Sequence, residues 1–264
     1  MGLLERFPLL EYDPTLEPER PDWLIHTMWM NHKINGIFGQ EKSGKSRLIG
    51  WLLAALYNPR SSTVLGQTIS TIPRKILYLA GEETRADIIG RLKQYTDILG
   101  GDANAILPIT FQEASGMRLD TATQRKEMEG LLIEGGYDTL IIEPLRRVHA
   151  GNENDSTAMS AIHNEWRKWS TTLGITIIVC HHTPKLNEDS DMTRIATWIR
   201  GSTDLASILD SAIFVQPTLL CAKNFRRLKL LRAGRFPSQD PLYIDDLGDP
   251  IEGGSGFFIS KEQG

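Results

Sequence analysis

Short apolar runs alternate along the chain with segments in which apolar residues recur every three or four positions. The segments with a helical period or with capping residues are 45–58, 84–99, 121–136 and 156–174. The apolar runs, which we interpret as buried strands, are 34–39, 75–83, 107–112, 137–145 and 175–182. Because parallel strands that are covered on both faces are apolar throughout, this order predicts an α/β fold with a mostly parallel central sheet and helices on both faces.

The two ends of the chain follow different patterns. After about residue 210 the sequence has short strand-like segments with no helical period between them, which predicts antiparallel strands at one edge of the sheet. Residues 1–22 contain four prolines and no sustained period, and we expect an extended lead-in there. No repeat or linker divides the remainder, so residues 23–264 are predicted to form one domain.

One stretch between a predicted strand and a predicted helix combines glycine, lysine and serine at a fixed spacing. It reads G-x-x-x-x-G-K-S, the pattern of a loop whose backbone N–H groups surround the phosphates of a nucleoside triphosphate. In that pattern Lys45 reaches the β- and γ-phosphates and the Ser46 hydroxyl binds Mg²⁺. A glycine-rich turn with a capping serine would not require all of these residues. The residues predicted to bind ATP are Gly39, Gln40, Glu41, Lys42, Ser43, Gly44, Lys45, Ser46 and Arg47.

Polar residues follow three of the predicted strands, at the edge of a parallel sheet where ligands bind. They are Glu82 with Glu83, then Glu143, then His181 with His182. One carboxylate at such an edge can hold Mg²⁺ through water, a second can deprotonate an attacking water, and an imidazole can contact the γ-phosphate. The alternative is a set of solvated loop residues. Zinc is not expected at the histidine pair, because neighbouring residues of a strand point to opposite faces.

The motifs occur in an order that resembles a known family. The phosphate loop, then "LYLAGEET", "LIIEPLRRVH", "IIVCHHTPK" and "RGSTDLASILDSAIF", is similar to RecA-like P-loop ATPases over roughly residues 30–240. Within them, the hexameric replicative helicases of the RepA type are more similar than the DnaB-like helicases. The resemblance implies that Glu82 is the catalytic base, that Glu143 handles Mg²⁺ where the family usually has Asp, and that His182 or His181 senses the γ-phosphate.

The resemblance also implies an oligomer. Members of this family complete each site with an arginine from the adjacent subunit, which stabilises charge on the transferred phosphoryl group. The matching candidates are Arg200, which precedes "GST", and the pair Arg232 and Arg235 in "LLRAGRF". Each of them could instead pair with a surface acid. A homo-oligomer, as a hexameric ring, is therefore expected.

Nucleic-acid binding is less clearly indicated by the residues themselves. The net charge is −4, so there is no overall positive field to attract DNA. In related motors, loops after the metal and sensor strands contact single-stranded DNA, and the matching cations here are Arg146, Arg147, Lys185 and Arg194. Acidic residues lie among them, so binding would depend on contacts accumulated over several subunits.

The expected function is an ATP-hydrolysing motor, a ring-forming helicase or translocase on single-stranded DNA. One alternative is a recombinase or recombination-mediator ATPase that assembles on DNA, and another is an ATP-gated scaffold with slow hydrolysis, which Glu143 in place of Asp favours. The N-terminal segment is a candidate to bind a replication or recombination partner. The two cysteines have no disulfide-like or ligand-like spacing, and no apolar run is long enough to cross a bilayer. A cytoplasmic protein without a membrane partner is expected.

Overall fold

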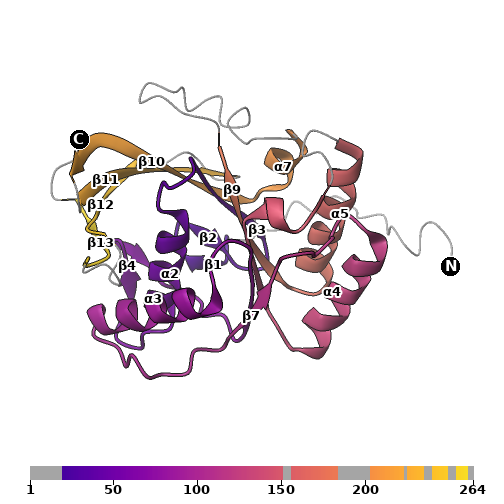
Figure 1. Cartoon of the computed structure of the whole chain (residues 1–264), viewed down its shortest axis with the longest axis horizontal. Coiled ribbons are helices and arrows are strands. Elements are labelled where there is room, and N and C mark those ends of the chain that lie inside the picture. The colour runs from indigo at the N-terminus through magenta and orange to yellow at the C-terminus, as the bar shows by residue number, and fades with distance from the viewer. Residues whose placement is uncertain are drawn as a thin grey trace, which may run out of the picture.

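The structure is a computed structural model that describes residues 20–150, 156–183, 203–222, 225–234, 240–248 and 254–260. A nine-stranded sheet runs through the centre of the molecule, in the order β13-β12-β11-β10-β3-β9-β8-β6-β7 (Figure 1). Its strands are β3 (Ile34–Gly39), β6 (Ile76–Ala80), β7 (Ile109–Glu113), β8 (Thr139–Glu143), β9 (Thr176–His182), β10 (Ser211–Ala222), β11 (Phe225–Gly234), β12 (Leu242–Asp246) and β13 (Phe257–Ile259).

The sheet has a parallel part and an antiparallel part. Strands β10, β3, β9, β8, β6 and β7 pair in parallel with one another. The segment of β10 was expected among the antiparallel strands, but it pairs in parallel with β3 and is antiparallel only to β11. Strands β11, β12 and β13 continue the sheet beyond β10 as antiparallel neighbours. The predicted α/β class, with a mostly parallel sheet and antiparallel strands at one edge, is therefore confirmed.

Helices cover both faces of this sheet, as Figure 1 shows. Helices α2 and α3 pack on one face, and α4 and α5 pack on the other. The helices are α2 (Lys45–Leu56), α3 (Arg85–Ile98), α4 (Ala122–Glu134), α5 (Ser156–Thr172) and the short α7 (Thr203–Ile208), with a 3-10 turn η1 (Leu145–Arg147). The sequence pattern predicted the four long helices. It did not predict α7, which is only six residues long and has little room to show a period.

Two small hairpins accompany the α2 face. They are β1 (Trp23–Ile25) with β2 (Trp29–Met30), and β4 (Thr63–Val64) with β5 (Gln67–Thr68). Residues 1–19 lie outside the described residues, so the extended lead-in and the single domain after it stay predictions.

Side chains alternate between the two faces of the sheet along each strand, and apolar side chains occupy both faces. In β6, Tyr78 and Ala80 face the core under α2 and α3, whereas Leu77 and Leu79 face the core under α4 and α5. All five β6 residues are buried. Because the central strands are parallel and in register, their carboxyl ends meet at one edge of the sheet.

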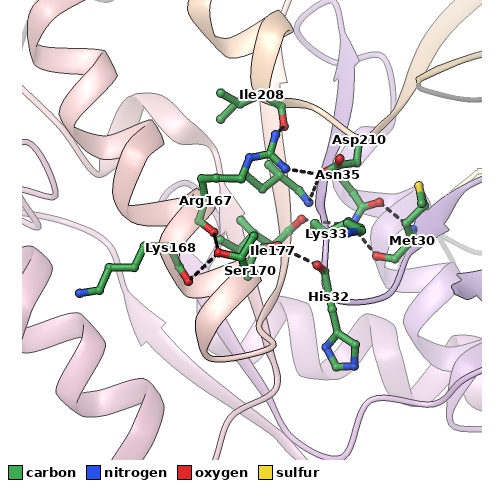
Figure 2. A network of polar contacts seen from close by, with 12 residues as sticks. Met30, His32, Lys33, Asn35, Arg167, Lys168, Ser170, Ile177, Ile208 and Asp210 are labelled. Carbon is green, nitrogen blue, oxygen red and sulfur yellow. Dashed lines mark hydrogen bonds and ion pairs between the residues drawn. The ribbon is translucent and has the colours of Figure 1, made fainter. Parts of the chain in front are cut away.

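The opposite end of the sheet is held by a buried polar network (Figure 2). Asp210 accepts hydrogen bonds from the Ile34 backbone N–H, at 3.1 Å, and from Arg167, at 2.9 Å. Asn35 is fully buried in β3 and bonds to three backbone segments. Its partners are Met30 N at 2.7 Å, Met30 O at 2.9 Å, Lys33 O at 3.1 Å and Ile177 O at 3.3 Å. The side chain of Asn35 thus satisfies backbone groups that the strand ladder leaves over.

We predict that Asn35→Ala lowers the free energy of unfolding by ~3 kcal/mol, because it leaves several buried backbone groups without a partner. Chemical denaturation measures this change. The control is Asn104→Ala, since Asn104 is exposed and its backbone N–H rather than its side chain bonds to Asp102. Equal stability of the two variants would contradict the structural role of Asn35.

Candidate functional site

A cavity of about 650 Å³ lies at the carboxyl-end edge of the sheet. The loop between β3 and α2 forms one wall, and residues that follow β6, β8 and β9 form another. Glu82, Glu83, Glu143 and His182 line this cavity together with Lys45. The structure therefore brings together residues that the sequence predicted to share one edge.

The loop before α2 keeps its shape because of two glycines. A Cβ atom at Gly39 would lie 2.6 Å from the Val215 carbonyl oxygen and 2.7 Å from Ser43 Oγ, so no side chain fits there. Gly44 is the N-cap of α2 with a φ of 94°, a conformation that glycine adopts without strain. The first N–H groups of a helix have no intrahelical acceptor, and glycine has no side chain that could accept from them.

Lys45 folds back over this loop. Its side chain is 5% exposed, and Nζ donates to the carbonyl oxygens of Gly39 at 2.9 Å and Gln40 at 2.7 Å. His182 Nδ1 lies 3.4 Å from Nζ. Burial lowers the pKa of Lys45, and nearby acids, with Glu143 foremost among the carboxylates, oppose that shift. The loop also holds Ser43, whose buried Oγ has no hydrogen-bond partner among the described residues.

Glu143 ends β8 in a buried position. The Tyr78 hydroxyl donates a hydrogen bond to its Oε2. Burial raises the pKa of Glu143 to about 7, although the Ser46 hydroxyl, the Lys45 charge and the Cys180 thiol favour the carboxylate. Neither the hydroxyl nor the thiol makes a close bond to Oε1, which is buried without a partner among the described residues.

The two glutamates after β6 have different surroundings. Glu83 forms a two-pronged ion pair with Arg91, with oxygen-to-nitrogen distances of 2.7 and 2.9 Å. Glu82 is exposed on the cavity wall, and within the described part of the chain its carboxylate has no ion pair. Of the two, Glu82 is therefore the carboxylate that can accept a proton from a water molecule.

The histidine pair is divided by the sheet. His182 lies opposite Gly39 in the β3–β9 register and lines the cavity. His181 lies opposite Phe38, is 2% exposed, and is oriented with Val179 toward the other face. The sequence left both histidines as candidates for contact with a phosphate, and the structure brings only His182 to the site. Within the described residues, no group of three or more His, Cys, Asp or Glu side chains that could hold a metal ion occurs.

The predicted arginines are placed in three ways. Arg146 and Arg147 are exposed in η1, directly after Glu143 and Pro144. Arg232 lies away from the cavity, where it donates to Thr27 Oγ1 and to the Asp240 carbonyl, both at 2.7 Å. Four predicted residues lie outside the described residues: Lys185, Arg194, Arg200 and Arg235.

The remaining loop residues surround the cavity to different extents. Glu41 and Lys42 are exposed and line it, and Gln40 is half-buried. Glu41 and Lys42 are thus adjacent residues of opposite charge that lie in water at the cavity. Arg47 lines the cavity too, but its guanidinium pairs with Asp246 of β12.

Several residues of the site were not predicted from the sequence. Tyr78 could have been found, because its hydroxyl is the one polar side-chain group of the apolar strand ILYLA. Cys180 could have been placed by strand alternation, two residues before His182 in β9. Arg226 and Asp246 carry no such signal, because they reach the loop only through the antiparallel strands β11 and β12.

Among the described residues, no helix is both long and apolar enough to cross a membrane.

The raised pKa of Glu143 has a consequence for stability. Because the folded protein holds this proton up to about pH 7 while an unfolded glutamate loses it near 4.5, stability falls as the pH rises through that window. We predict that Glu143→Gln removes this fall and is more stable than the wild type by ~3 kcal/mol at pH 8 but not at pH 4. Denaturation without Mg²⁺ or nucleotide measures it, and parallel pH profiles of the two proteins would show that the burial of Glu143 has no such effect.

Comparison with known proteins places this site in a family. Residues 4–188 match a family described as an AAA domain, and this match includes the phosphate loop, Glu82, Glu143 and His182. Comparison with curated proteins finds no match. The mostly parallel sheet with helices on both faces is consistent with a RecA-like P-loop NTPase fold. Because the match covers more than half of the chain, this P-loop ATPase belongs to the AAA domain family.

Proposed function

We propose that the protein is an ATP-driven motor, a ring-forming helicase or translocase that acts on single-stranded DNA. The observation that carries the ATPase part is the cavity in which a glycine loop, an uncapped helix start and two dissimilar carboxylates converge. The DNA part is supported by the two exposed arginines that follow Glu143 and by the resemblance to hexameric replicative helicases of the RepA type.

ATP would be bound mainly by backbone groups and Lys45. The residues at the start of α2 line the cavity, and the positive end of the helix dipole favours phosphate there. Lys45 now donates to loop carbonyls, and phosphate oxygens would offer it charged acceptors that form stronger hydrogen bonds. The buried Ser43 hydroxyl is a further donor in the same loop.

Mg²⁺ would be held by Ser46 and Glu143. The buried Oε1 of Glu143 lacks a hydrogen-bond partner within the described residues. A buried oxygen without a partner is unfavourable, and a bound cation would supply the missing partner. When bound, the ion neutralises charge on the phosphates. Tyr78 holds the other carboxylate oxygen and fixes the direction of the side chain.

Hydrolysis would use Glu82 and His182. Glu82 is exposed on the cavity wall and its carboxylate has no ion pair among the described residues, which supports a role in orienting and deprotonating water. His182 lies beside Lys45 Nζ, which supports a contact between its imidazole and the γ-phosphate. His181 is not proposed for this role, because it faces the opposite side of the sheet.

Coupling to DNA would pass through the turn after β8. The stem of Arg147 packs on Gly81, so closely that a Cβ on this glycine would lie 2.4 Å from Arg147 Cγ. Gly81 immediately precedes Glu82. A DNA strand bound to Arg146 and Arg147 would therefore act on the protein backbone that carries the proposed base, Glu82. Lys185 and Arg194 are proposed to extend this contact.

A trans-acting arginine is part of this proposal and requires a homo-oligomer, as a hexameric ring. Arg200 and Arg235 remain the stronger candidates for that role. Arg232 is a weaker one, because it is half-buried and already donates to Thr27 and Asp240 of its own chain. An assembly that forms filaments and anneals strands would instead indicate a recombinase or recombination mediator, which would share every residue of this cavity.

A second candidate function is an ATP-gated oligomer with slow hydrolysis. The bond from Tyr78 and the pKa of about 7 favour it, since a fraction of Glu143 must lose a proton before it can hold Mg²⁺ at neutral pH. This candidate is distinguished by turnover that is slow and indifferent to DNA, while ATP still changes the oligomeric mass.

We predict that Lys45→Ala abolishes ATP binding, whereas Glu82→Gln retains binding and reduces turnover by ~10²-fold or more. The reason is that Glu82→Gln removes the proposed base and leaves the groups that bind the phosphates in place. Fluorescent-nucleotide titration and phosphate release measure the two effects. Glu83→Gln is the matched control, since its carboxylate is held by Arg91. Near-normal turnover of Glu82→Gln would assign the base to another residue.

We predict that Arg146→Ala with Arg147→Ala removes the stimulation of ATP hydrolysis by single-stranded DNA and leaves hydrolysis without DNA nearly unchanged. The reason is that these exposed cations would contact the DNA phosphates and not the nucleotide. The charge-matched control is Arg60→Ala with Arg74→Ala, both exposed and remote from the carboxyl-end edge. If both double variants respond to DNA as the wild type does, η1 is not the DNA contact.

A further inference from the structure

A buried carboxylate joins the antiparallel strands to the phosphate loop. Asp246 of β12 has a fully buried side chain, and its Oδ2 accepts hydrogen bonds from two arginines. Arg226 of β11 donates through Nε at 3.1 Å and Nη2 at 2.7 Å. Arg47, in the first turn of α2, donates through Nη2 to the same oxygen. The other oxygen, Oδ1, accepts the Gly248 N–H at 3.1 Å. Strands β11 and β12 are thereby attached to the start of α2.

Arg226 also contacts the phosphate loop directly. Its Nη1 donates to the Lys42 carbonyl oxygen at 2.7 Å. Its Nη2 lies so close to the helix N-cap that a Cβ atom at Gly44 would be 3.0 Å away. A single guanidinium thus binds the loop on one side and Asp246 on the other. This arrangement restrains the carbonyl of Lys42, a residue with a φ of 59°, in the middle of the phosphate loop.

The carboxylate and the two guanidinium groups of this cluster compensate one another's charge. A buried carboxylate without a partner is costly, and two guanidiniums compensate it. The arginine side chains are only 17% and 26% exposed, so water weakens these bonds little. One carboxylate and two guanidiniums leave one positive charge on a wall of the cavity, on the side of the loop opposite Glu143.

We propose that Arg226 and Asp246 are positioning residues for the phosphate loop, through which strands β11 and β12 hold the loop in its phosphate-binding shape. This inference rests on ATP binding at the cavity and does not depend on a DNA partner. Neither residue acts on the reacting atoms. Arg226 restrains the loop backbone, and Asp246 restrains Arg226 and the first turn of α2.

The same two strands contain a matched control. Arg227 and Asp245 are neighbours of Arg226 and Asp246 in the β11–β12 register, and they form an ion pair of 2.9 Å. Because side chains alternate along a strand, this second pair lies on the opposite face of the sheet and does not line the cavity. Its loss removes an arginine–aspartate pair from the same strands without contact to the phosphate loop.

The experiment compares Arg226→Gln and Asp246→Asn with Arg227→Gln and Asp245→Asn in the full-length protein. We expect the first two to raise KM for ATP about tenfold with a much smaller change in kcat. The reason is that a less restrained loop weakens binding of ATP and binding of the transition state by the same factor. The two control variants should keep the wild-type KM. Thermal unfolding verifies that each variant is folded, and titration with a fluorescent ATP analogue gives the dissociation constant independently of turnover.

Asp246→Asn separates positioning from simple charge. This change adds one positive charge beside the site, so a purely electrostatic role predicts tighter ATP binding, whereas a positioning role predicts weaker binding. Tighter binding by Asp246→Asn would overturn the proposal, and so would equal ATP affinities of Arg226→Gln and Arg227→Gln. If Asp246→Asn does not fold, the comparison of these two arginine variants decides. If the wild type binds the analogue without hydrolysing ATP, the proposed function fails while the comparison of dissociation constants still tests the loop.

Discussion

The unsatisfied N–H groups at the start of α2 are the constraint on which this structure depends. A helix start that binds phosphate must remain uncapped, and a buried uncapped start is unfavourable unless other groups hold it in place. The chain meets this need with glycine at position 44, which offers no side-chain cap, and with Lys45, which folds over the loop carbonyls. Gly39 leaves the space that the loop requires between β3 and Val215.

Two glutamates at one edge of the sheet acquire different chemistry from their surroundings. Glu143 is buried beside Tyr78 and Cys180, and its pKa rises to about 7. Glu82 follows a neighbouring strand but is exposed to water. Residue type is therefore the same at both positions, and burial is what raises the pKa of Glu143 while Glu82 remains in water.

The antiparallel strands give the sheet more than an additional edge. They place Arg226 and Asp246 beside the phosphate loop, where a buried ion-pair cluster restrains both the loop and the first turn of α2. The opposite end of the parallel strands is held by Asn35 and Asp210 (Figure 2). Polar networks therefore lie at both ends of the sheet, and the two apolar layers fill the space between the sheet and the helices.

Local pattern alone determined much of this protein. Apolar runs and helical periods located β3, β6, β7, β8 and β9 and the four long helices, but not the parallel pairing of β10. The spacing of Gly39, Gly44, Lys45 and Ser46 identified the phosphate loop, because period and backbone chemistry are properties of adjacent residues. The tertiary structure decided which of two histidines reaches the site, which glutamate is buried, and that Arg226 and Asp246 belong to it. Those outcomes depend on strand register and on contacts between residues far apart in the chain, and such contacts leave no periodic signal in the sequence.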